Sequence, residues 1–340
     1  MNSLRTAVVG ASGYSGEELI RLLLRHPNAD LSCITSRTYA GQLIGSVFPR
    51  FAESALRFSN SDADAIAESA DVAFLALPHG LAAEFAVPLL EKGLRVIDIS
   101  ADFRLRNQQL YRDYYNLEHP APGWLAEAVY GLPERRRQAI RDARLIACPG
   151  CYPTSVLLPL LPLLEKELVS APLTSFSMSG VTGAGRKVDL PFIFPECNES
   201  VRPYSVTGHR HVPEMEQELS LAAGHPVALS FIPHLIPVSR GIHSTITATL
   251  SAGVNAAAIR DAWADCYATA PFVRVLAEGK LADTKHVTMS NVCEIGVACN
   301  ESTGTVILSS AIDNLTKGAS GQALQCMNLM CGFDETAGLS

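Results

Sequence analysis

Residues 4–24 read LRTAVVGASGYSGEELIRLLL and place an apolar strand pattern, a glycine-rich turn and an amphipathic helical pattern in direct succession. A dinucleotide site needs this order, because glycines let the backbone approach the pyrophosphate, whose charge lies at the helix N-terminus. The glycine spacing is G-x-x-G-x-x-G rather than the commoner G-x-G-x-x-G, so a tight turn without a ligand is the alternative. We expect a dinucleotide to bind at Gly10, Ser12, Gly13, Tyr14, Ser15 and Gly16.

The second strand pattern, residues 30–35, indicates which dinucleotide binds. NAD enzymes carry an acidic residue after this strand to bind the ribose hydroxyl, whereas this chain has Ser36 and Arg37. An arginine there accommodates a 2′-phosphate through charge-assisted hydrogen bonds, which predicts NADP(H) as the cofactor. The alternative is a solvated loop residue. Pro78 follows the apolar strand pattern 72–77, where open α/β sheets bind ligands, and we expect it to contact the cofactor.

The pattern of elements changes near residue 150. Before it, continuous apolar strands such as 72–77 and 94–99 alternate with helical segments such as 81–92, which predicts a parallel sheet covered on both faces. After it, the strand patterns are longer and half-polar, which predicts a mixed or antiparallel sheet with one exposed face. These patterns cover residues 174–179, 227–232, 244–250, 284–297 and 305–312, and the tail, 317–331, is helical again.

These patterns predict an α/β protein with a Rossmann-type dinucleotide-binding domain and an α+β domain with a mixed or antiparallel sheet. We place the first domain at residues 1–150, completed by a C-terminal helix within 313–340, and the second at residues 151–312. A chain of 340 residues fits two domains, since one core rarely grows beyond about 250–300 residues.

The composition agrees with a soluble cytoplasmic enzyme. The net charge of −7 gives no basic footprint for a nucleic acid. Every apolar run of about 18 residues is interrupted by proline or charge, so we expect neither a membrane span nor a signal peptide. The nine cysteines are an odd number without a disulfide spacing pattern, and we expect reduced thiols.

Cys151 lies between a strand pattern, 143–147, and an apolar helical pattern, 156–168. A thiol there is near the first backbone N–H groups of a helix, where the macrodipole favours negative charge. This environment stabilises the thiolate, which is the nucleophilic form of cysteine. Cys151 is therefore a candidate nucleophile.

Residues 208–218 read GHRHVPEMEQE and predict a helix that begins near Pro213. His211 precedes this helix and Glu214 lies in its first turn, so the two side chains are within hydrogen-bonding reach. A carboxylate that orients an imidazole supports a general acid or base, or the activation of a thiol. Capping and packing roles for the histidines are the alternative.

Cys148 and Cys151 together with His209 and His211 also make up the ligand set of a structural zinc site. Against zinc, histidines two apart on an extended segment point to opposite sides, and the pairs lack the usual finger spacing. A dithiol redox pair is the second alternative, since Cys-x-x-Cys at a helix start is typical of thioredoxin-type sites. The flanking pattern of those sites is missing, and we expect no metal.

Eight blocks of the chain, taken in order, resemble the N-acetyl-γ-glutamyl-phosphate reductases of arginine biosynthesis, an NADP-dependent family of the aspartate-semialdehyde dehydrogenase-like superfamily. The blocks are Gly10–Gly16, Asp98–Arg104, Tyr130–Glu134, Pro149–Thr154, Gly180–Lys187, His209–Glu214, Pro233–Gly241 and Asp313–Gln322. They span nearly the whole chain, so the resemblance is specific. Cys148 is a departure, because the family usually has Asn before Pro-Gly-Cys. The contact that the Asn side-chain amide makes beside the nucleophile is therefore not expected in this chain.

The resemblance implies that N-acetyl-glutamyl 5-phosphate is reduced with NADPH to N-acetyl-glutamate 5-semialdehyde and phosphate. Cys151 would form a thioester, His211 would move protons and Glu214 would orient His211. A homo-oligomer, dimer or tetramer, is expected, with 151–312 as the catalytic and dimerisation domain. Further cofactor contacts are expected from Ser179, Gly180, Asn314 and Lys317, and contacts to the anionic substrate from Arg104, Arg186, Arg210 and Arg240, with Lys187 in the same block.

Two other functions stay open at this point. A related reductase with an aspartyl-phosphate or aminoadipyl-phosphate substrate shares the mechanism or the fold. A non-catalytic NADP-binding regulator shares the fold alone, and the intact set of Cys151, His211 and Glu214 argues against it.

Overall fold

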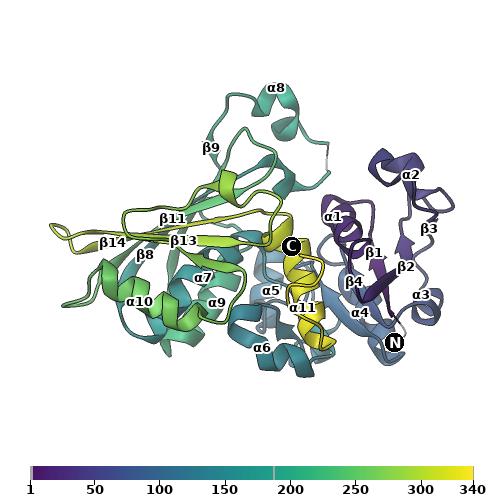
Figure 1. Cartoon of the computed structure of the whole chain (residues 1–340), viewed down its shortest axis with the longest axis horizontal. Helices are drawn as coiled ribbons and strands as arrows, with labels where there is room; N and C mark the ends of the chain where they lie inside the picture. The colour runs from purple at the N-terminus through teal and green to yellow at the C-terminus, as the bar shows by residue number, and fades with distance from the viewer. Residues whose placement is uncertain (1–2, 187, 340) are drawn as a thin grey trace. The chain divides into compact units, whose positions relative to one another are not determined.

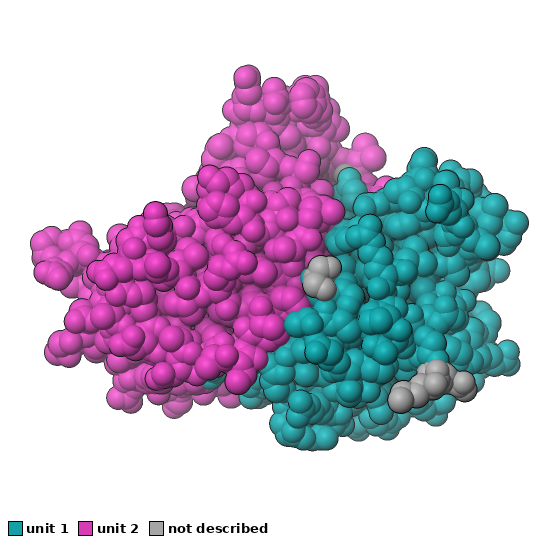
Figure 2. All heavy atoms as spheres, in the orientation of Figure 1, with its two compact units in different colours: residues 1–149, 319–340 teal, residues 150–318 magenta. Residues whose placement is uncertain are grey.

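The computed structural model describes residues 3–186 and 188–339. The chain forms two compact units, residues 1–149 with 319–340 and residues 150–318 (Figure 2). Each unit contains a seven-stranded sheet.

The sheet of the first unit is parallel, in the strand order β3-β2-β1-β4-β5-β7-β6 (Figure 1). The chain order reverses between β1 and β4, and doubly wound sheets bind dinucleotides at this point, beyond the carboxyl ends of the strands. The predicted Rossmann-type fold is confirmed. The strands are β1 (Leu4–Val9), β2 (Ala29–Thr35), β3 (Phe58–Ser59), β4 (Val72–Leu75), β5 (Arg95–Asp98), β6 (Val129–Tyr130) and β7 (Leu145–Ala147).

Helix α1 (Tyr14–Leu23) follows β1 closely and buries the apolar side of its amphipathic pattern. Gly16 in its first turn contacts the preceding loop so tightly that a Cβ there would lie 2.7 Å from the Gly10 carbonyl oxygen and the Ala11 Cα. The third glycine of the motif therefore serves close packing of helix against strand. The other helices of the unit are α2 (Ile44–Val47), α3 (Ala63–Ser69), α4 (Ala82–Glu91), α5 (Gln108–Tyr115), α6 (Pro133–Asp142) and α11 (Gly321–Met330).

The N-terminus of α4 is occupied by a carboxylate of the same unit. Asp102 accepts hydrogen bonds from the backbone N–H groups of Gly80 (2.6 Å), Ala82 (2.9 Å) and Ala83 (3.2 Å). The N-terminus of α1 has no such side chain, because Gly13 is its N-cap. Of these two helix starts beside the switch point, α1 is thus the one that can receive a ligand phosphate.

Helix α11 returns the end of the chain to the first unit, where it packs against α1 and α6. The Ser320 hydroxyl donates to the Ser15 carbonyl (2.8 Å), and Nε2 of His26 bonds Oδ1 of Asn328 (2.8 Å). The helix begins at Gly321 rather than at residue 317, because residues 316–320 form one wide π-type turn.

The second unit has a mixed sheet in the order β12-β13-β14-β11-β8-β10-β9. Strand β8 pairs in parallel with β10 and antiparallel with β11, so the predicted mixed sheet is confirmed. The strands are β8 (Val169–Ser179), β9 (Arg202–Pro203), β10 (Leu229–Leu235), β11 (Ile242–Leu250), β12 (Val273–Val275), β13 (Cys293–Asn300) and β14 (Thr305–Ile312).

Three long helices, α7 (Cys151–Glu165), α9 (Val212–Ala223) and α10 (Ala256–Tyr267), belong to this unit. Helix α7 begins at Cys151, five residues before the expected Val156, because the helix N-terminus tolerates Pro153, whose missing N–H has no helical partner there. The expected strand 284–297 is wrong in its first half. The Asp283 carboxylate accepts the Lys285 N–H and starts a 3₁₀ turn, so β13 begins only at Cys293.

Residues 181–186 and 188–206 form an arm of short turns that contains one short helix, α8 (Phe194–Cys197), and the two-residue strand β9 (Figure 1). The sequence patterns give no expectation for this arm. It carries six exposed large apolar side chains: Val188, Leu190, Ile193, Phe194, Val201 and Val206. Among the residues described, no helix combines the length and the apolar composition that crossing a bilayer requires.

We predict that Gly16→Ala destabilises the first unit, since the added Cβ meets backbone atoms that cannot move aside as a side chain would. Overpacking of this kind typically costs about 1–3 kcal/mol. The urea midpoint followed by circular dichroism measures the loss. Gly123→Ala is the control, because nothing lies within 4 Å of its Cβ position. Equal shifts for both variants would contradict the packing role of Gly16.

Candidate active site

Cys151 is the first residue of α7, so the structure places its thiol at the start of a 15-residue helix. The residue is partly exposed, and its Cβ is approached by the turn that ends at Gly318, where an added Cβ would lie 2.8 Å away. The positive end of the helix dipole favours the thiolate form at this position. Cys151 therefore combines access with the electrostatics that a nucleophile needs.

His211 lies against the residue that precedes Cys151. Its ring carbons would be 2.8 Å from a Cβ added at Gly150, closer than real Cβ atoms approach a neighbour. Glycine at position 150 therefore makes room for the imidazole. The structure thus brings His211 and Cys151, 60 residues apart in sequence, to the same helix start.

Glu214 is buried, and its Oε1 accepts the backbone N–H of Gly150 (2.8 Å). The carboxylate thus binds the N-cap of α7 and holds the loop in front of the nucleophile. A negative charge is favourable at this helix end. Glu214 and His211 both lie at the start of α9 and both contact Gly150, so one residue links the three expected catalytic side chains.

His209 supports the backbone of His211, since its Nδ1 accepts the His211 N–H (3.1 Å). Burial, and then the charge of Arg210, lowers the pKa of His209 to about 4. The ring is therefore neutral at physiological pH, which leaves Nδ1 able to accept. His209 therefore holds the backbone of His211 in place, a contact that sequence spacing does not reveal.

Two phenols, Tyr152 and Tyr204, complete the surroundings of the histidines. Their hydroxyl oxygens are 2.9 Å apart, and their rings lie 5.5 Å and 5.7 Å from that of His209. Burial raises the pKa of Tyr204 to about 12 and raises that of Tyr152 as well, with a contribution from the Cys151 charge in both cases. No sequence motif indicates a role for these two phenols.

The alternative zinc site finds no support in the geometry. Within the described residues, 3–186 and 188–339, no three His, Cys, Asp or Glu side chains gather as ligands for a metal ion. Cys148 is fully buried at the end of β7, and all nine cysteines are thiols.

The expected cofactor residues of the first unit lie at the carboxyl ends of β1, β2 and β4. Gly10–Gly13 form the turn into α1, and Tyr14, Ser15 and Gly16 are its first residues. The Ser36 hydroxyl donates to the Ser12 hydroxyl (3.0 Å), which joins the ends of β1 and β2. Arg37 and Pro78 are exposed. An uncapped helix N-terminus beside an exposed arginine fits a dinucleotide that carries an additional phosphate.

The expected cofactor residues of the second unit are bound to their own unit. Asn314 accepts the Gly241 N–H (2.8 Å) and donates to the Thr182 hydroxyl (2.9 Å). Lys317 is fully buried, with its ammonium 5.9 Å from the centre of the Phe272 ring. The Ser179 hydroxyl donates to the Gly180 carbonyl (3.0 Å). The contacts of Asn314 and Lys317 hold the 313–318 turn against segments that flank β8, β11 and β12, whereas the Ser179 bond is local.

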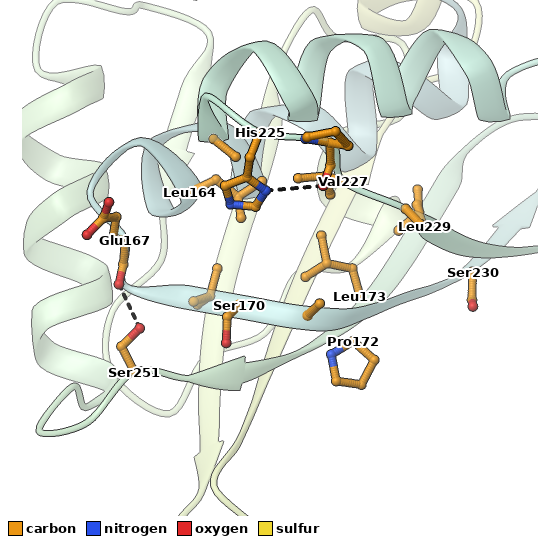
Figure 3. Close-up of a pocket in the computed structure, with 15 residues that line it drawn as sticks. Leu164, Glu167, Ser170, Pro172, Leu173, His225, Val227, Leu229, Ser230 and Ser251 are labelled. Carbon is orange, nitrogen blue, oxygen red and sulfur yellow. Dashed lines mark hydrogen bonds between the residues drawn. The ribbon is translucent and has the colours of Figure 1, made fainter.

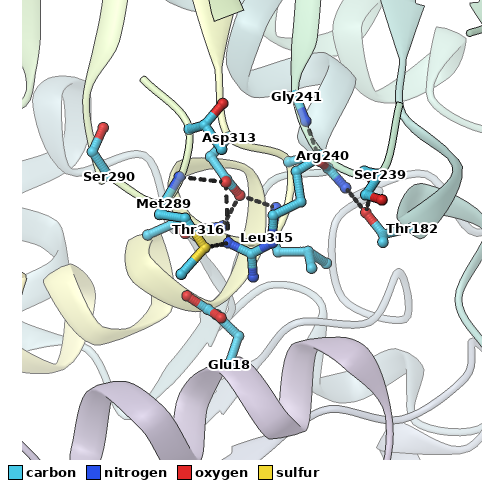
Figure 4. Close-up of polar contacts among 12 residues, drawn as sticks. Glu18, Thr182, Ser239, Arg240, Gly241, Met289, Ser290, Asp313, Leu315 and Thr316 are labelled. Atoms are coloured by element: carbon cyan, nitrogen blue, oxygen red, sulfur yellow. Dashed lines mark hydrogen bonds and ion pairs between the residues drawn. The ribbon is translucent and has the colours of Figure 1, made fainter. Parts of the chain in front are cut away.

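Arg240 has an anionic partner inside the protein. Asp313 accepts from Arg240 (3.1 Å) and from the N–H groups of Met289, Leu315 and Thr316, at 2.7–2.9 Å (Figure 4). The Arg240 side chain is only 16% exposed. Its guanidinium is therefore paired with a carboxylate of the protein itself.

The other expected substrate arginines differ in exposure. Arg104 is 8% exposed and donates to the carbonyls of Cys148 (2.7 Å) and Ile99 (2.8 Å). It thereby holds the end of β7. Arg186 and Arg210 are exposed, and Lys187 lies outside the described residues.

A cavity of about 780 Å³ in the second unit lies at the opposite end of α7 (Figure 3). Leu164 in its wall is 13 residues after Cys151, about 20 Å along a helix. The lining includes Leu173, Val227 and Leu229 and offers Glu167 and His225 as its titratable side chains. Nothing in this lining resembles the chemistry at Cys151.

Comparison with known proteins assigns both units. Residues 5–143 match the family model described as the NAD binding domain of semialdehyde dehydrogenase, and residues 151–314 match the model described as its dimerisation domain. An N-acetyl-gamma-glutamyl-phosphate reductase of Akkermansia muciniphila is 54% identical over 100% of this chain and 99% of its own length. Proteins of the same name from Moorella thermoacetica and Geobacter metallireducens are 47% and 49% identical, with 99% of this chain and 98% of each relative covered.

Solved structures share the fold at much lower identity. Aspartate semialdehyde dehydrogenase II from Vibrio cholerae has a TM-score of 0.75 at 19% identity, covering 97% of this chain and 99% of that one. Aspartate semialdehyde dehydrogenase with NADP from Candida albicans has a TM-score of 0.72 at 15% identity, covering 96% and 98%. With both domain models matched and relatives about half identical over their full length, the chain belongs to the N-acetyl-gamma-glutamyl-phosphate reductase family of semialdehyde dehydrogenases.

Proposed function

We propose that this chain reduces N-acetyl-L-glutamyl 5-phosphate to N-acetyl-L-glutamate 5-semialdehyde with NADPH, releasing phosphate, as a step of arginine biosynthesis. The observation that carries the proposal is the placement of Cys151 at the start of α7 with His211 against Gly150. The names of the full-length relatives support the substrate.

The first step uses groups of the second unit. The Cys151 thiolate attacks the acyl carbon, the carbon–oxygen bond to phosphate breaks, and inorganic phosphate leaves behind a thioester. His211 accepts the thiol proton and returns a proton later in the cycle. Splitting the reaction in this way replaces one difficult step by two easier ones. When bound, NADPH supplies the hydride that reduces the thioester to the aldehyde.

Backbone N–H groups at the start of α7 stabilise the oxyanion in this proposal. Three of the neighbouring positions are already committed: Gly150 donates to Glu214, Thr154 donates to the Gly150 carbonyl, and Pro153 has no N–H. The N–H groups of Cys151 and Tyr152 remain, and we assign the role to them.

The match to an NAD binding domain supports a nicotinamide cofactor, and we propose NADP(H) in particular. Gly10, Ser12, Gly13, Tyr14, Ser15 and Gly16 hold the pyrophosphate, and Ser36 and Arg37 hold the 2′-phosphate. Pro78, Ser179, Gly180, Asn314 and Lys317 stay proposed as further contacts. For the substrate anions we favour Arg186 and Arg210, because they are exposed, over Arg104 and Arg240.

We propose a homo-oligomer, dimer or tetramer, located in the cytoplasm. The dimerisation-domain match and the exposed apolar side chains of the arm, 181–206, support assembly, because such patches mark interaction surfaces. The nine cysteines, all free thiols, support a reducing compartment.

Comparing the activity on three semialdehydes distinguishes the proposed function from that of the related reductases. NADP⁺ reduction with phosphate and N-acetyl-glutamate semialdehyde should far exceed the rates with aspartate or aminoadipate semialdehyde.

Cys151→Ser should abolish this activity and leave NADPH binding nearly intact, because a serine hydroxyl at neutral pH does not replace a thiolate. Cys148→Asn, the control, restores the usual family residue and should be tolerated. If Cys151→Ser retained a tenth of the activity, covalent catalysis by Cys151 would be excluded. If Cys148→Asn lost as much activity as Cys151→Ser, the result would favour the dithiol redox pair instead.

Arg37→Ala should weaken NADPH binding far more than NADH binding, since only NADPH carries the 2′-phosphate. Fluorescence titration of the apoenzyme with each nucleotide measures both affinities. Arg57, another arginine of the first unit, donates to the Gly41 carbonyl and supplies the matched control, Arg57→Ala. Equal losses for NADPH and NADH would show that Arg37 is structural.

His211→Asn should lower kcat by roughly 10²–10⁴-fold, as expected for a positioned acid/base. His209→Asn should cost much less, because an amide oxygen still accepts the His211 N–H. Glu214→Gln should be intermediate, since it still accepts the Gly150 N–H but loses its charge. In pH–rate profiles, the limb abolished in His211→Asn should persist in Glu214→Gln. A larger loss in His209→Asn than in His211→Asn would invert the assignment.

A further inference from the structure

Four serine hydroxyls form a hydrogen-bonded chain between α7 and the sheet of the second unit. Ser175 and Ser177 come from β8, Ser244 from β11 and Ser155 from α7, and all four residues are fully buried. The successive oxygen–oxygen distances are 3.0, 2.7 and 2.7 Å. The chain ends where the Ser155 hydroxyl donates to the Tyr152 carbonyl (2.9 Å). We call these four residues the hydroxyl chain.

The end of the hydroxyl chain fixes its direction. A carbonyl oxygen has no proton, so the single proton of Ser155 is committed to Tyr152. Ser244 must therefore donate to Ser155, and by the same reasoning Ser177 donates to Ser244 and Ser175 donates to Ser177. Aligned donors polarise one another, so each bond strengthens the next.

The hydroxyl chain acts on the turn that carries Cys151. Tyr152 is the next residue, and Ser155, four residues after Cys151, lies one helical turn further along the same face. At the sheet, Ser177 and Ser244 are direct cross-strand partners. The first turn of α7 is therefore tied by hydrogen bonds to two neighbouring strands.

Stability alone does not account for four hydroxyls at this place. Each buried hydroxyl costs free energy unless it is paired, and apolar side chains in the same space cost nothing of this kind. The adjacent contacts of α7 are apolar, with Val156 and Leu157 fully buried. What a directed polar network adds is a single arrangement, because sliding the helix would break the Ser155–Ser244 bond, which joins it to the sheet, and would disturb the aligned bonds behind it.

We propose that the hydroxyl chain is a positioning network that sets the place of the Cys151 thiolate and the Tyr152 N–H. The proposal rests on the proposed role of Cys151 as nucleophile. Ser155, Ser177 and Ser244 touch neither substrate nor cofactor in it and act through the first turn of α7.

Ser244→Ala tests the proposal, because it interrupts the hydroxyl chain at its centre. We expect kcat to fall by roughly 10–100-fold, the scale of a misplacement of about 1 Å, with KM for the semialdehyde and for NADP⁺ changed by less than about twofold. Iodoacetamide alkylation of Cys151, followed by mass spectrometry of its peptide, should slow, and its pH profile should move to higher pH.

Ser310→Ala is the matched control. Ser310 is the cross-strand partner of Ser244 on β14, is equally buried, and contacts Cys293 (3.5 Å) rather than a member of the hydroxyl chain. It should lose comparable thermal stability while keeping kcat and the alkylation profile of Cys151. If Ser244→Ala does not fold, Ser155→Ala is measured in the same way, because it removes the hydroxyl that joins Ser244 to the Tyr152 carbonyl.

An unchanged kcat and an unchanged alkylation profile in Ser244→Ala would overturn the proposal. Equal losses of kcat in Ser310→Ala would overturn it as well. The failure of the proposed function is a separate result. In that case the unmodified protein itself lacks phosphate-dependent semialdehyde oxidation, whereas the alkylation comparison needs no turnover and still reports on the hydroxyl chain.

Discussion

The contacts of Gly150 are the constraint on which the site depends. Its N–H is held by the Glu214 carboxylate, its Cα is covered by the His211 ring, and the next residue is the proposed nucleophile. A side chain at this position would displace the imidazole from the helix start. The start of α9 and the start of α7 can meet only because residue 150 has none. The placement of His211 beside the start of α7 therefore depends on the absence of a side chain at position 150.

Three helix N-termini in the chain have three different uses. In the first unit α4 is saturated by Asp102, an internal anion that closes it to ligands, while α1 begins at Gly13 without a side-chain cap. In the second unit α7 begins at Cys151 itself. The same backbone electrostatics therefore stabilises the fold at α4, favours a ligand phosphate at α1 and favours a thiolate at α7. What distinguishes them is the group at the helix start: the Asp102 carboxylate at α4, no capping side chain at α1, and the Cys151 thiol beside Glu214 at α7.

Local patterns predicted the parts of the structure that local physics determines. The strand, glycine turn and helix of 4–24 and the apolar strands 72–77 and 94–99 gave the parallel sheet, because their periodicity reflects burial on both faces. The expected strand 284–297 failed in its first half, where the Asp283 cap competes with the strand pattern. The arm, the phenol pair of Tyr152 and Tyr204 and the hydroxyl chain were not predicted. Each depends on partners far apart in sequence, which no periodicity encodes.

The expected binding residues show a further limit of sequence reasoning. Arginine and asparagine are suited to anions and amides, and the sequence identifies them by type, but it does not tell whether the protein itself uses their polar groups. Arg104 donates to the carbonyls of Cys148 and Ile99, and Asn314 bonds Gly241 and Thr182. Such residues shape the site by holding its backbone, and their loss would move the walls of the site. The two proposed substrate arginines that are exposed to solvent are Arg186, within the arm, and Arg210, four residues after it.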